Sequence, residues 1–331
     1  MWHVCTDRRR HPAERVLWAA LVVLAWYGAF SVSVSRWRRY QDTPTVTSLE
    51  RDYMAWNTTF PAITVCPTGG PGSRVRPELA DEEAQRLARE FRVQNESLLR
   101  EFVERLSDAS LYTLPDIPNV SAIPGDRFLG IIERVTAPWN FAVVASLASD
   151  MATATYKPDL VPTLTELGMC YSFNSLVAAY MSPRYWRLGA AGVADGRGHG
   201  LLEVNPMDGS VFAQLSGLPG AYQLFVHGPE EVPDLQSPFL TSPEGQFKRL
   251  EVSALAVHTA PAARWLRPEH RRCRFMDEPL EPGAGAPRLA APVYSYALCR
   301  KACRAGVALR ACECVPHLYG PMCKQRLLTG W

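Results

Sequence analysis

The chain has little excess of either charge. Its 35 basic and 33 acidic residues leave a formal net charge of +2, which gives no electrostatic reason to expect a nucleic-acid partner. It has no internal repeat, and no hydrolase, nucleotide-binding or metalloprotease motif surrounds its carboxylates and histidines, for example Asp150, Glu166, His199 and His227. We therefore expect neither a nucleic-acid-binding protein nor an enzyme, and no cofactor.

Long apolar runs are also scarce, and only one is long enough to cross a bilayer. The residues from Val16 to Ser35 carry no charge and are bounded by Arg15 and Arg36. Twenty helical residues at ~1.5 Å each span roughly 30 Å, about one hydrocarbon core. The sequence predicts a transmembrane helix at 16–35 after a short cytoplasmic segment at 1–15. Trp37 and Tyr40 follow it and suit an interfacial aromatic belt.

A cleaved signal peptide is the alternative for the first forty residues. The start is basic, the middle is apolar, and Ala29 and Ser31 are spaced as a cleavage site would require. Basic residues lie on both sides of the apolar run, so the positive-inside rule does not decide the orientation. Both interpretations export the rest of the chain.

Cysteines and glycosylation acceptors are concentrated beyond the apolar run. Eight of the nine cysteines lie there, and thiols that must pair persist as disulfides in oxidising compartments. Three acceptor tripeptides, which begin at Asn57, Asn95 and Asn119, lie on the same side. We therefore expect 36–331 to be extracellular.

The exported part reads as mainly β structure with inserted helices. Residues 60–67, 168–174, 201–204, 221–227 and 250–258 have the composition of strands. From Asp81 to about Asp108, apolar residues recur at helical spacing, which predicts one long helix or two shorter ones with one packing face. The apolar piece Phe141–Leu147 is too short to span a membrane.

Six cysteines near the carboxyl end raise the question of a zinc site. Structural zinc ligands come in matched pairs that are usually two to four residues apart. The spacings here are irregular and the expected compartment is oxidising, so we expect disulfides instead of a metal. Cys312 and Cys314 are too close to bridge each other easily and need partners elsewhere.

Several motifs occur together in one order along the chain. They are Phe60-Pro-Ala-Ile-Thr-Val-Cys66 after a first span, Gly168-Met-Cys170-Tyr-Ser-Phe-Asn174, and the Cys-x3-Cys and Cys-x-Cys pairs followed by Val315-Pro316. Together these motifs resemble the degenerin/epithelial sodium channel family. The stretches Leu266-Arg-Pro-Glu-His-Arg-Arg-Cys273-Arg-Phe and Val293-Tyr-Ser-Tyr-Ala-Leu-Cys299 look like the insect pickpocket branch. The similarity runs from about Arg15 to Cys323.

The resemblance implies an α+β membrane protein with an N-terminal transmembrane helix and a disulfide-rich ectodomain. A β-sheet palm, a helical finger at 81–108 and a partial, cysteine-rich thumb at 293–331 would form that ectodomain. It implies disulfides Cys66–Cys170 and Cys314–Cys323, and partners in a missing half for Cys273, Cys299, Cys303 and Cys312. Trp37 and Tyr40 are candidate wrist residues between ectodomain and span, as an alternative to the aromatic belt.

The implied function is passive Na⁺ transport across the plasma membrane by a homo- or heterotrimeric, amiloride-sensitive-type channel, gated by a ligand or by force. The family's second span, which holds the selectivity filter, does not follow the thumb in these residues, and the family's His-Gly gating pair is absent before the first span. We therefore expect a partial subunit. A single-pass or secreted, disulfide-stapled binding module without a pore is the alternative.

Overall fold

The structure is a computed structural model that describes residues 11–49, 54, 56–68, 75–136, 142–147, 160–189, 201–205, 207, 211–253, 255, 257–278 and 293–320. The chain divides into two compact units. The first contains residues 1–51 and 257–274, and the second contains residues 52–256 and 275–331.

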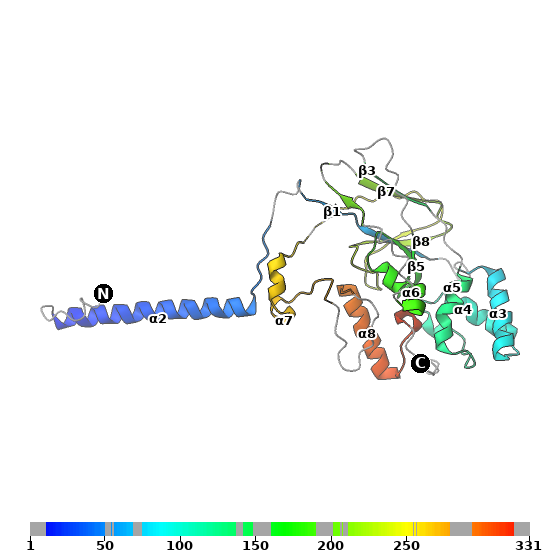
Figure 1. The fold of residues 1–331 in the computed structure, drawn as a ribbon, viewed down its shortest axis with the longest axis horizontal. Coiled ribbons are helices and arrows are strands. Elements are labelled where there is room, and N and C mark those ends of the chain that lie inside the picture. Colours follow the sequence, from blue (N-terminus) through cyan, green and yellow to red (C-terminus); the bar gives the residue numbers. More distant parts are fainter. Residues whose placement is uncertain are drawn as a thin grey trace. The chain divides into compact units, whose positions relative to one another are not determined.

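The first unit contains the predicted apolar helix. Helix α2 runs from Pro12 to Asp42, with Pro12 in its first turn and the His11 side chain as its N-cap (Figure 1). It is longer than the predicted 16–35 and has no buried residue. Among the described residues it is the one helix long and apolar enough to cross a membrane. The same unit contains the 3-10 helix η7 (Pro261–Trp265) and the short helix α7 (Pro268–Arg271).

A five-stranded antiparallel sheet organises the second unit. Its order is β4 (Val161–Thr165), β5 (Gly168–Phe173), β2 (Ala62–Pro67), β8 (Tyr222–His227) and β9 (Leu240–Ser242). Every residue of β2 and β5 is buried, which accounts for the absence of charged side chains from both strands. The strands predicted at 60–67, 168–174 and 221–227 are therefore confirmed with small shifts in their ends.

Two smaller strand pairs accompany this sheet. Strand β1 (Thr58–Thr59) pairs with β6 (Glu203–Val204), and β3 (Ala142–Leu147) pairs with β7 (Val211–Ser216). Residues 142–147 of the predicted apolar piece thus form a strand, and Val143 packs with Ala213 and Leu215 against the large sheet. The strand predicted at 250–258 is wrong for the described residues of that segment, which pair with no strand and leave Leu255 and Val257 exposed.

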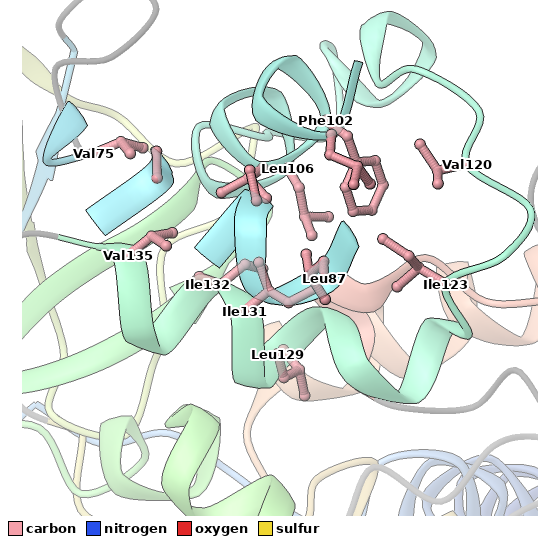
Figure 2. Close-up of a cluster of buried hydrophobic side chains, with 14 of the residues drawn as sticks. Val75, Leu87, Phe102, Leu106, Val120, Ile123, Leu129, Ile131, Ile132 and Val135 are labelled. Carbon is pink, nitrogen blue, oxygen red and sulfur yellow. The ribbon is translucent and has the colours of Figure 1, made fainter. Parts of the chain in front are cut away.

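The helical pattern predicted at 81–108 is present as two helices. Helix α3 (Pro77–Phe91) ends where Arg92 adopts a left-handed conformation with φ 53°, and α4 (Glu96–Ser107) begins at the Asn95 N-cap. Helix α5 (Phe128–Val135) completes this helical layer after the 3-10 turns η2 (Leu114–Asp116) and η3 (Gly125–Arg127). Leu87, Phe102 and Leu106 point into one core, as the pattern predicted (Figure 2).

One buried ion pair fastens α3 to α5 beside this core. Arg134 donates to both carboxylate oxygens of Glu83, the shortest contact being 2.6 Å, and Arg86 donates to the same group. Burial by itself would raise the pKa of Glu83, but the hydrogen bonds from Arg134 and Arg86 outweigh it and lower the pKa. Glu83 is therefore a charged, fully partnered group within the helical layer.

Two α-helices and two 3-10 turns complete the described part of the second unit. The 3-10 turn η4 (Ala178–Met181) and helix α6 (Pro183–Leu188) come directly after β5. Helix α8 (Tyr296–Cys312) and the 3-10 turn η8 (His317–Tyr319) lie in the predicted cysteine-rich segment at 293–331. Leu318 of η8 packs in the same core as α3 to α5, so the end of the described chain is anchored to the helical layer.

A candidate site at the buried ion pairs of helix α8

Two acceptors fix the start of α8. The hydroxyl of Ser295 accepts a hydrogen bond from the Leu298 amide at 3.2 Å, and a carboxylate oxygen of Glu231 accepts one from the Ala297 amide at 2.9 Å. Helix N-terminal amides have no intrahelical acceptors, so both side chains satisfy groups that would otherwise be unpaired. Burial raises the pKa of Glu231, against the opposing effect of its backbone hydrogen bonds.

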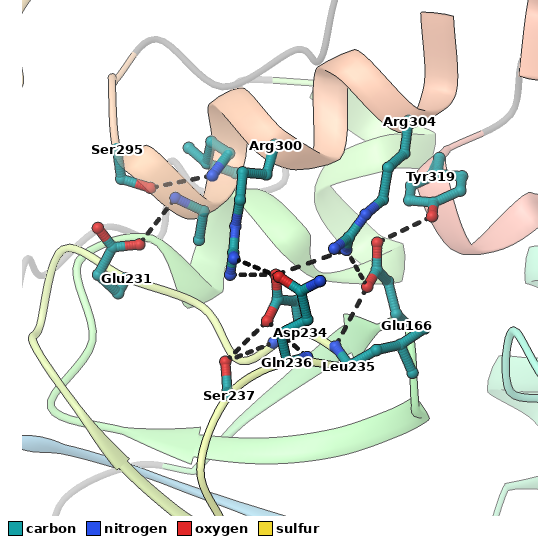
Figure 3. Close-up of polar contacts among 12 residues, drawn as sticks. Glu166, Glu231, Asp234, Leu235, Gln236, Ser237, Ser295, Arg300, Arg304 and Tyr319 are labelled. Atoms are coloured by element: carbon teal, nitrogen blue, oxygen red, sulfur yellow. Dashed lines mark hydrogen bonds and ion pairs between the residues drawn. The ribbon is translucent and has the colours of Figure 1, made fainter. Parts of the chain in front are cut away.

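Two arginines one helical turn apart connect α8 to the sheet. Arg300 forms an ion pair with Asp234, and Arg304 donates to Glu166 at 2.5 Å and to Asp234 at 3.4 Å (Figure 3). The two carboxylate side chains are almost completely buried, whereas both arginines are partly exposed. Residues four apart share one helix face, so this face of α8 is held by charge.

Glu166 is the centre of the cluster. It lies in the tight turn between β4 and β5. One of its oxygens accepts from the Tyr319 hydroxyl at 2.8 Å; the other accepts from Arg304 and from the Leu235 amide at 3.2 Å. A single side chain therefore joins a sheet turn, α8, η8 and the loop before β9. Burial and the hydrogen bond to Glu166 raise the pKa of Tyr319 above its ordinary range.

Asp234 is positioned by its own loop. One oxygen accepts from the Gln236 amide and from the Ser237 hydroxyl, both at 3.0 Å, which leaves the other oxygen for the arginines. The Gln236 side chain in turn accepts from Arg300 at 2.8 Å. The loop therefore orients the Asp234 carboxylate toward α8.

Lys301 lies on the same helix, turned toward the interior. Its ammonium group donates to the Leu164 carbonyl at 3.2 Å and lies 5.3 Å from the ring centre of Trp186 and 5.8 Å from that of Tyr319. Aromatic faces attract a cation. Burial lowers the pKa of Lys301 to about 8, although the charge of Glu166 acts in the opposite direction.

This arrangement suits mechanical coupling better than catalysis. The carboxylates of Glu166 and Asp234 are engaged by donors, and the pocket beside them, lined in part by Val232, Leu298 and Lys301, is small. Among the described residues no group of three or more histidine, cysteine or acidic side chains is placed to hold a metal ion. A movement of α8 would be transmitted directly to the β4–β5 turn, because buried charges cannot separate cheaply.

The structure places most of the predicted cysteines. Cys66 of β2 and Cys170 of β5 form a disulfide between neighbouring strands, the pairing that the resemblance implies. Cys314 is disulfide-bonded, and Cys323 lies outside the described residues. Cys273, Cys299, Cys303 and Cys312 are free thiols, and Cys303 and Cys312 are exposed.

The remaining predicted residues lie at the surface. Asn57, Asn95 and Asn119 are all exposed, and Trp37 and Tyr40 are exposed at the end of α2 with ring centres 6.1 Å apart. The α8 cluster was not predicted. Its only local signal is the spacing of Arg300 and Arg304, while Glu166 and Asp234 stand in no recognisable motif.

The described residues combine one helix that is long and apolar enough to cross a membrane with a mixed helix and sheet unit that contains an interstrand disulfide. The profile of the family described as amiloride-sensitive sodium channel matches residues 1–329, and the chain belongs to that family. A search of curated proteins finds no match. The family consists of ion channels of the plasma membrane, so the chain is a sodium channel subunit.

Proposed function

We propose that this chain is part of a pickpocket-like, amiloride-sensitive-type sodium channel whose gate is controlled from outside the membrane by a ligand or by force. The observation that carries the proposal is the α8 cluster, where Glu166 connects four segments of the second unit. A channel gated through its ectodomain needs a rigid element that moves together with the sheet. Helix α8, held by two buried carboxylates, supplies such an element.

The resemblance gives the parts of the second unit their roles in this proposal. The five-stranded sheet would be the palm, α3 and α4 the finger, and α8 the beginning of the thumb. In this assignment the Arg300 and Arg304 ion pairs are the thumb–palm joint. Na⁺ would pass through a homo- or heterotrimer whose pore is lined by a second span of the family.

An extracellular location of the second unit is part of the proposal. The Cys66–Cys170 disulfide supports it, because such bonds persist in oxidising compartments. The three exposed acceptor asparagines support it as well, because each could carry a glycan without disturbing the core. The alternative, a tethered binding module without a pore, is not favoured by a match to a sodium channel family over residues 1–329.

Electrical recording tests the channel. We expect oocytes that express the chain extended through a second span to pass an inward Na⁺ current that amiloride blocks, and oocytes that express residues 1–331 alone to pass none. Current from the 331-residue form would refute the assignment of the pore to a second span. Absence of amiloride-sensitive current from the extended chain, with surface expression verified by biotinylation, would refute the channel assignment.

A second recording tests the joint. Arg304→Met removes the contact with Glu166, and we expect it to change the stimulus needed for half-maximal current while leaving single-channel conductance unchanged. Arg310→Met is the matched control, because Arg310 is an exposed arginine of the same helix. Equal stimulus dependence of wild type and Arg304→Met would show that the cluster has only a structural role.

A further inference from the structure

One segment of the first unit combines several arginines with one tryptophan. The segment 257–274 belongs to the same compact unit as α2. It contains five arginines and a single acidic residue, Glu269, although the whole chain is almost neutral. The arginines are Arg264, Arg267, Arg271, Arg272 and Arg274. We call residues 261–274 the arginine–tryptophan loop.

One of these arginines, Arg271, stabilises the backbone of the loop. Arg271 is buried, and its guanidinium donates to the carbonyls of Cys273 at 2.8 Å and of Leu266 at 2.9 Å, with a longer contact to that of Ala263. Helix α7 ends directly after it, where Arg272 adopts a left-handed conformation. The loop is therefore an ordered element whose exposed side chains project from a fixed backbone.

The loop presents an indole ring and cations to its surroundings. Trp265 is 92% exposed. Arg267, Arg272 and Arg274 are exposed and form no ion pair with any residue that the structure describes. An indole ring left in water forgoes the favourable burial of a large apolar surface, so this combination indicates a partner with both an apolar layer and negative charge.

The end of α2 has the same composition. Arg36, Trp37, Arg38, Arg39 and Tyr40 follow the apolar stretch, and both aromatic rings are exposed. Tryptophan and arginine at this level of a membrane helix lie among lipid headgroups, where the ring meets the apolar boundary and the guanidinium meets phosphate. Because the arginine–tryptophan loop belongs to the same unit, the same chemistry is available to it.

We propose that the arginine–tryptophan loop rests on the phospholipid headgroup layer beside α2, with Trp265 at the apolar boundary and Arg267, Arg272 and Arg274 on lipid phosphates. Zwitterionic phospholipids also carry phosphate, so the contact requires no anionic leaflet. Anionic lipid would strengthen it through the net positive charge of the loop.

Fluorine NMR of the full chain in phosphatidylcholine nanodiscs tests this proposal. The chain is labelled with 5-fluorotryptophan, and the Trp265 resonance is identified by its loss in Trp265→Phe, which should fold because the side chain is exposed. Headgroup lipids that chelate gadolinium should broaden the resonances of Trp265 and Trp37. The resonance of Trp186, which is packed beside Lys301, should remain sharp.

Variants that remove the arginine charges test whether those charges hold Trp265 at the lipid headgroups. Arg267→Gln/Arg272→Gln/Arg274→Gln should reduce the broadening of Trp265 by about twofold or more, because each arginine near a lipid surface contributes to binding. Arg310→Gln on α8 should leave it unchanged. Inorganic phosphate without gadolinium lipid should not broaden Trp265.

Several results would overturn the proposal. A sharp Trp265 resonance beside a broadened Trp37 would show that the loop lies away from the headgroups, and sharp resonances for both would show that α2 is not in the bilayer. A Trp265 resonance that changes only when subunits associate would assign the loop to a protein interface instead. None of these readouts depends on ionic current, and a sharp Trp265 resonance beside a broadened Trp37 would overturn this proposal while leaving the channel proposal intact.

Discussion

The guanidinium of Arg304 lies 2.5 Å from a carboxylate oxygen of Glu166, a residue 138 positions earlier in the chain. This contact closes a long loop between α8 and the β4–β5 turn, and the carboxylate side of it is almost wholly buried. A charge in such surroundings is tolerated only while its partners are present. This ion pair therefore links the position of α8 to that of the sheet.

Removal of Arg304 should destabilise the second unit far more than removal of an exposed arginine. Loss of one partner of a buried pair costs about 3 to 5 kcal/mol of unfolding free energy. Because Arg304 is partly exposed, we expect the loss in Arg304→Met to lie near or below the lower end of that range. Arg249→Met is the control, since its ion pair with Glu251 is exposed on both sides, and such pairs contribute about 0 to 1 kcal/mol. Thermal unfolding of the full chain in detergent measures both. Equal losses for the two variants would contradict the buried role of Glu166.

Lys301 should make stability depend on alkaline pH. In the folded chain its pKa is lowered to about 8, whereas an unfolded lysine titrates near 10.5. The unfolded state therefore binds more protons between these values, and stability should rise as pH increases from 8 toward 10. Lys301→Met keeps the shape of the side chain and should remove this part of the pH dependence. Melting temperatures of both forms between pH 8 and about 10 check this. Parallel curves would show that folding does not lower the pKa of Lys301.

His317 should act in the opposite pH range. Its ring packs edge-on against Phe128 with centres 6.0 Å apart, and Nε2 has no hydrogen-bond partner among the described residues. Burial lowers its pKa to about 4, against 6.5 for the ordinary group. The unfolded state binds the extra proton between these values, so stability should be lost as pH falls from 6.5 to 4, by at most about 3.5 kcal/mol at ~1.4 kcal/mol per pKa unit.

His317→Phe isolates this effect. The substitution preserves an aromatic edge against Phe128 and removes the titrating nitrogen, so the variant should lose less stability than the wild type on acidification. The carboxylates, Glu83 among them, titrate in both forms and cancel in the difference. Identical acid sensitivity of the two proteins would show that protonation of His317 does not cause the loss of stability.

The sequence indicated the elements with strong local patterns and missed those that depend on distant partners. The strands around Cys66 and Cys170 are continuous apolar runs, and the helical face that contains Leu87 and Phe102 has a clear period. The segment 250–258 shows similar apolar content, but a strand also needs a neighbour, and none of the described strands pairs with it. Pairing is a property of the whole fold and leaves no trace in one segment.

The candidate site was invisible for the same reason. Arg300 and Arg304 could be recognised as two cations on one helix face, but a charged helix face is usually exposed to solvent. What makes these arginines different is burial of Glu166 and Asp234, which lie in two separate turns. The sequence allowed two helices at 81–108 but did not indicate where the break between α3 and α4 lies, because the left-handed residue there is Arg92 and not a glycine.

Asn95 has two roles that substitution can separate. Its side-chain oxygen accepts from the Leu98 amide at 3.0 Å and caps α4, while its nitrogen is the atom that an N-linked glycan would occupy in the tripeptide Asn95-Glu-Ser97. Asn95→Asp keeps the N-cap and removes the glycosylation site. Ser97→Ala removes the glycosylation site alone, and Asn95→Ala removes both the site and the N-cap. We expect all three variants to lose one glycan, seen as a smaller shift on treatment with peptide N-glycosidase. Only Asn95→Ala should also lose the ~1 kcal/mol that an N-cap contributes. An unchanged glycosidase shift in all three would show that Asn95 is not modified, and equal melting temperatures of the deglycosylated Asp and Ala variants would show that the cap does not stabilise α4.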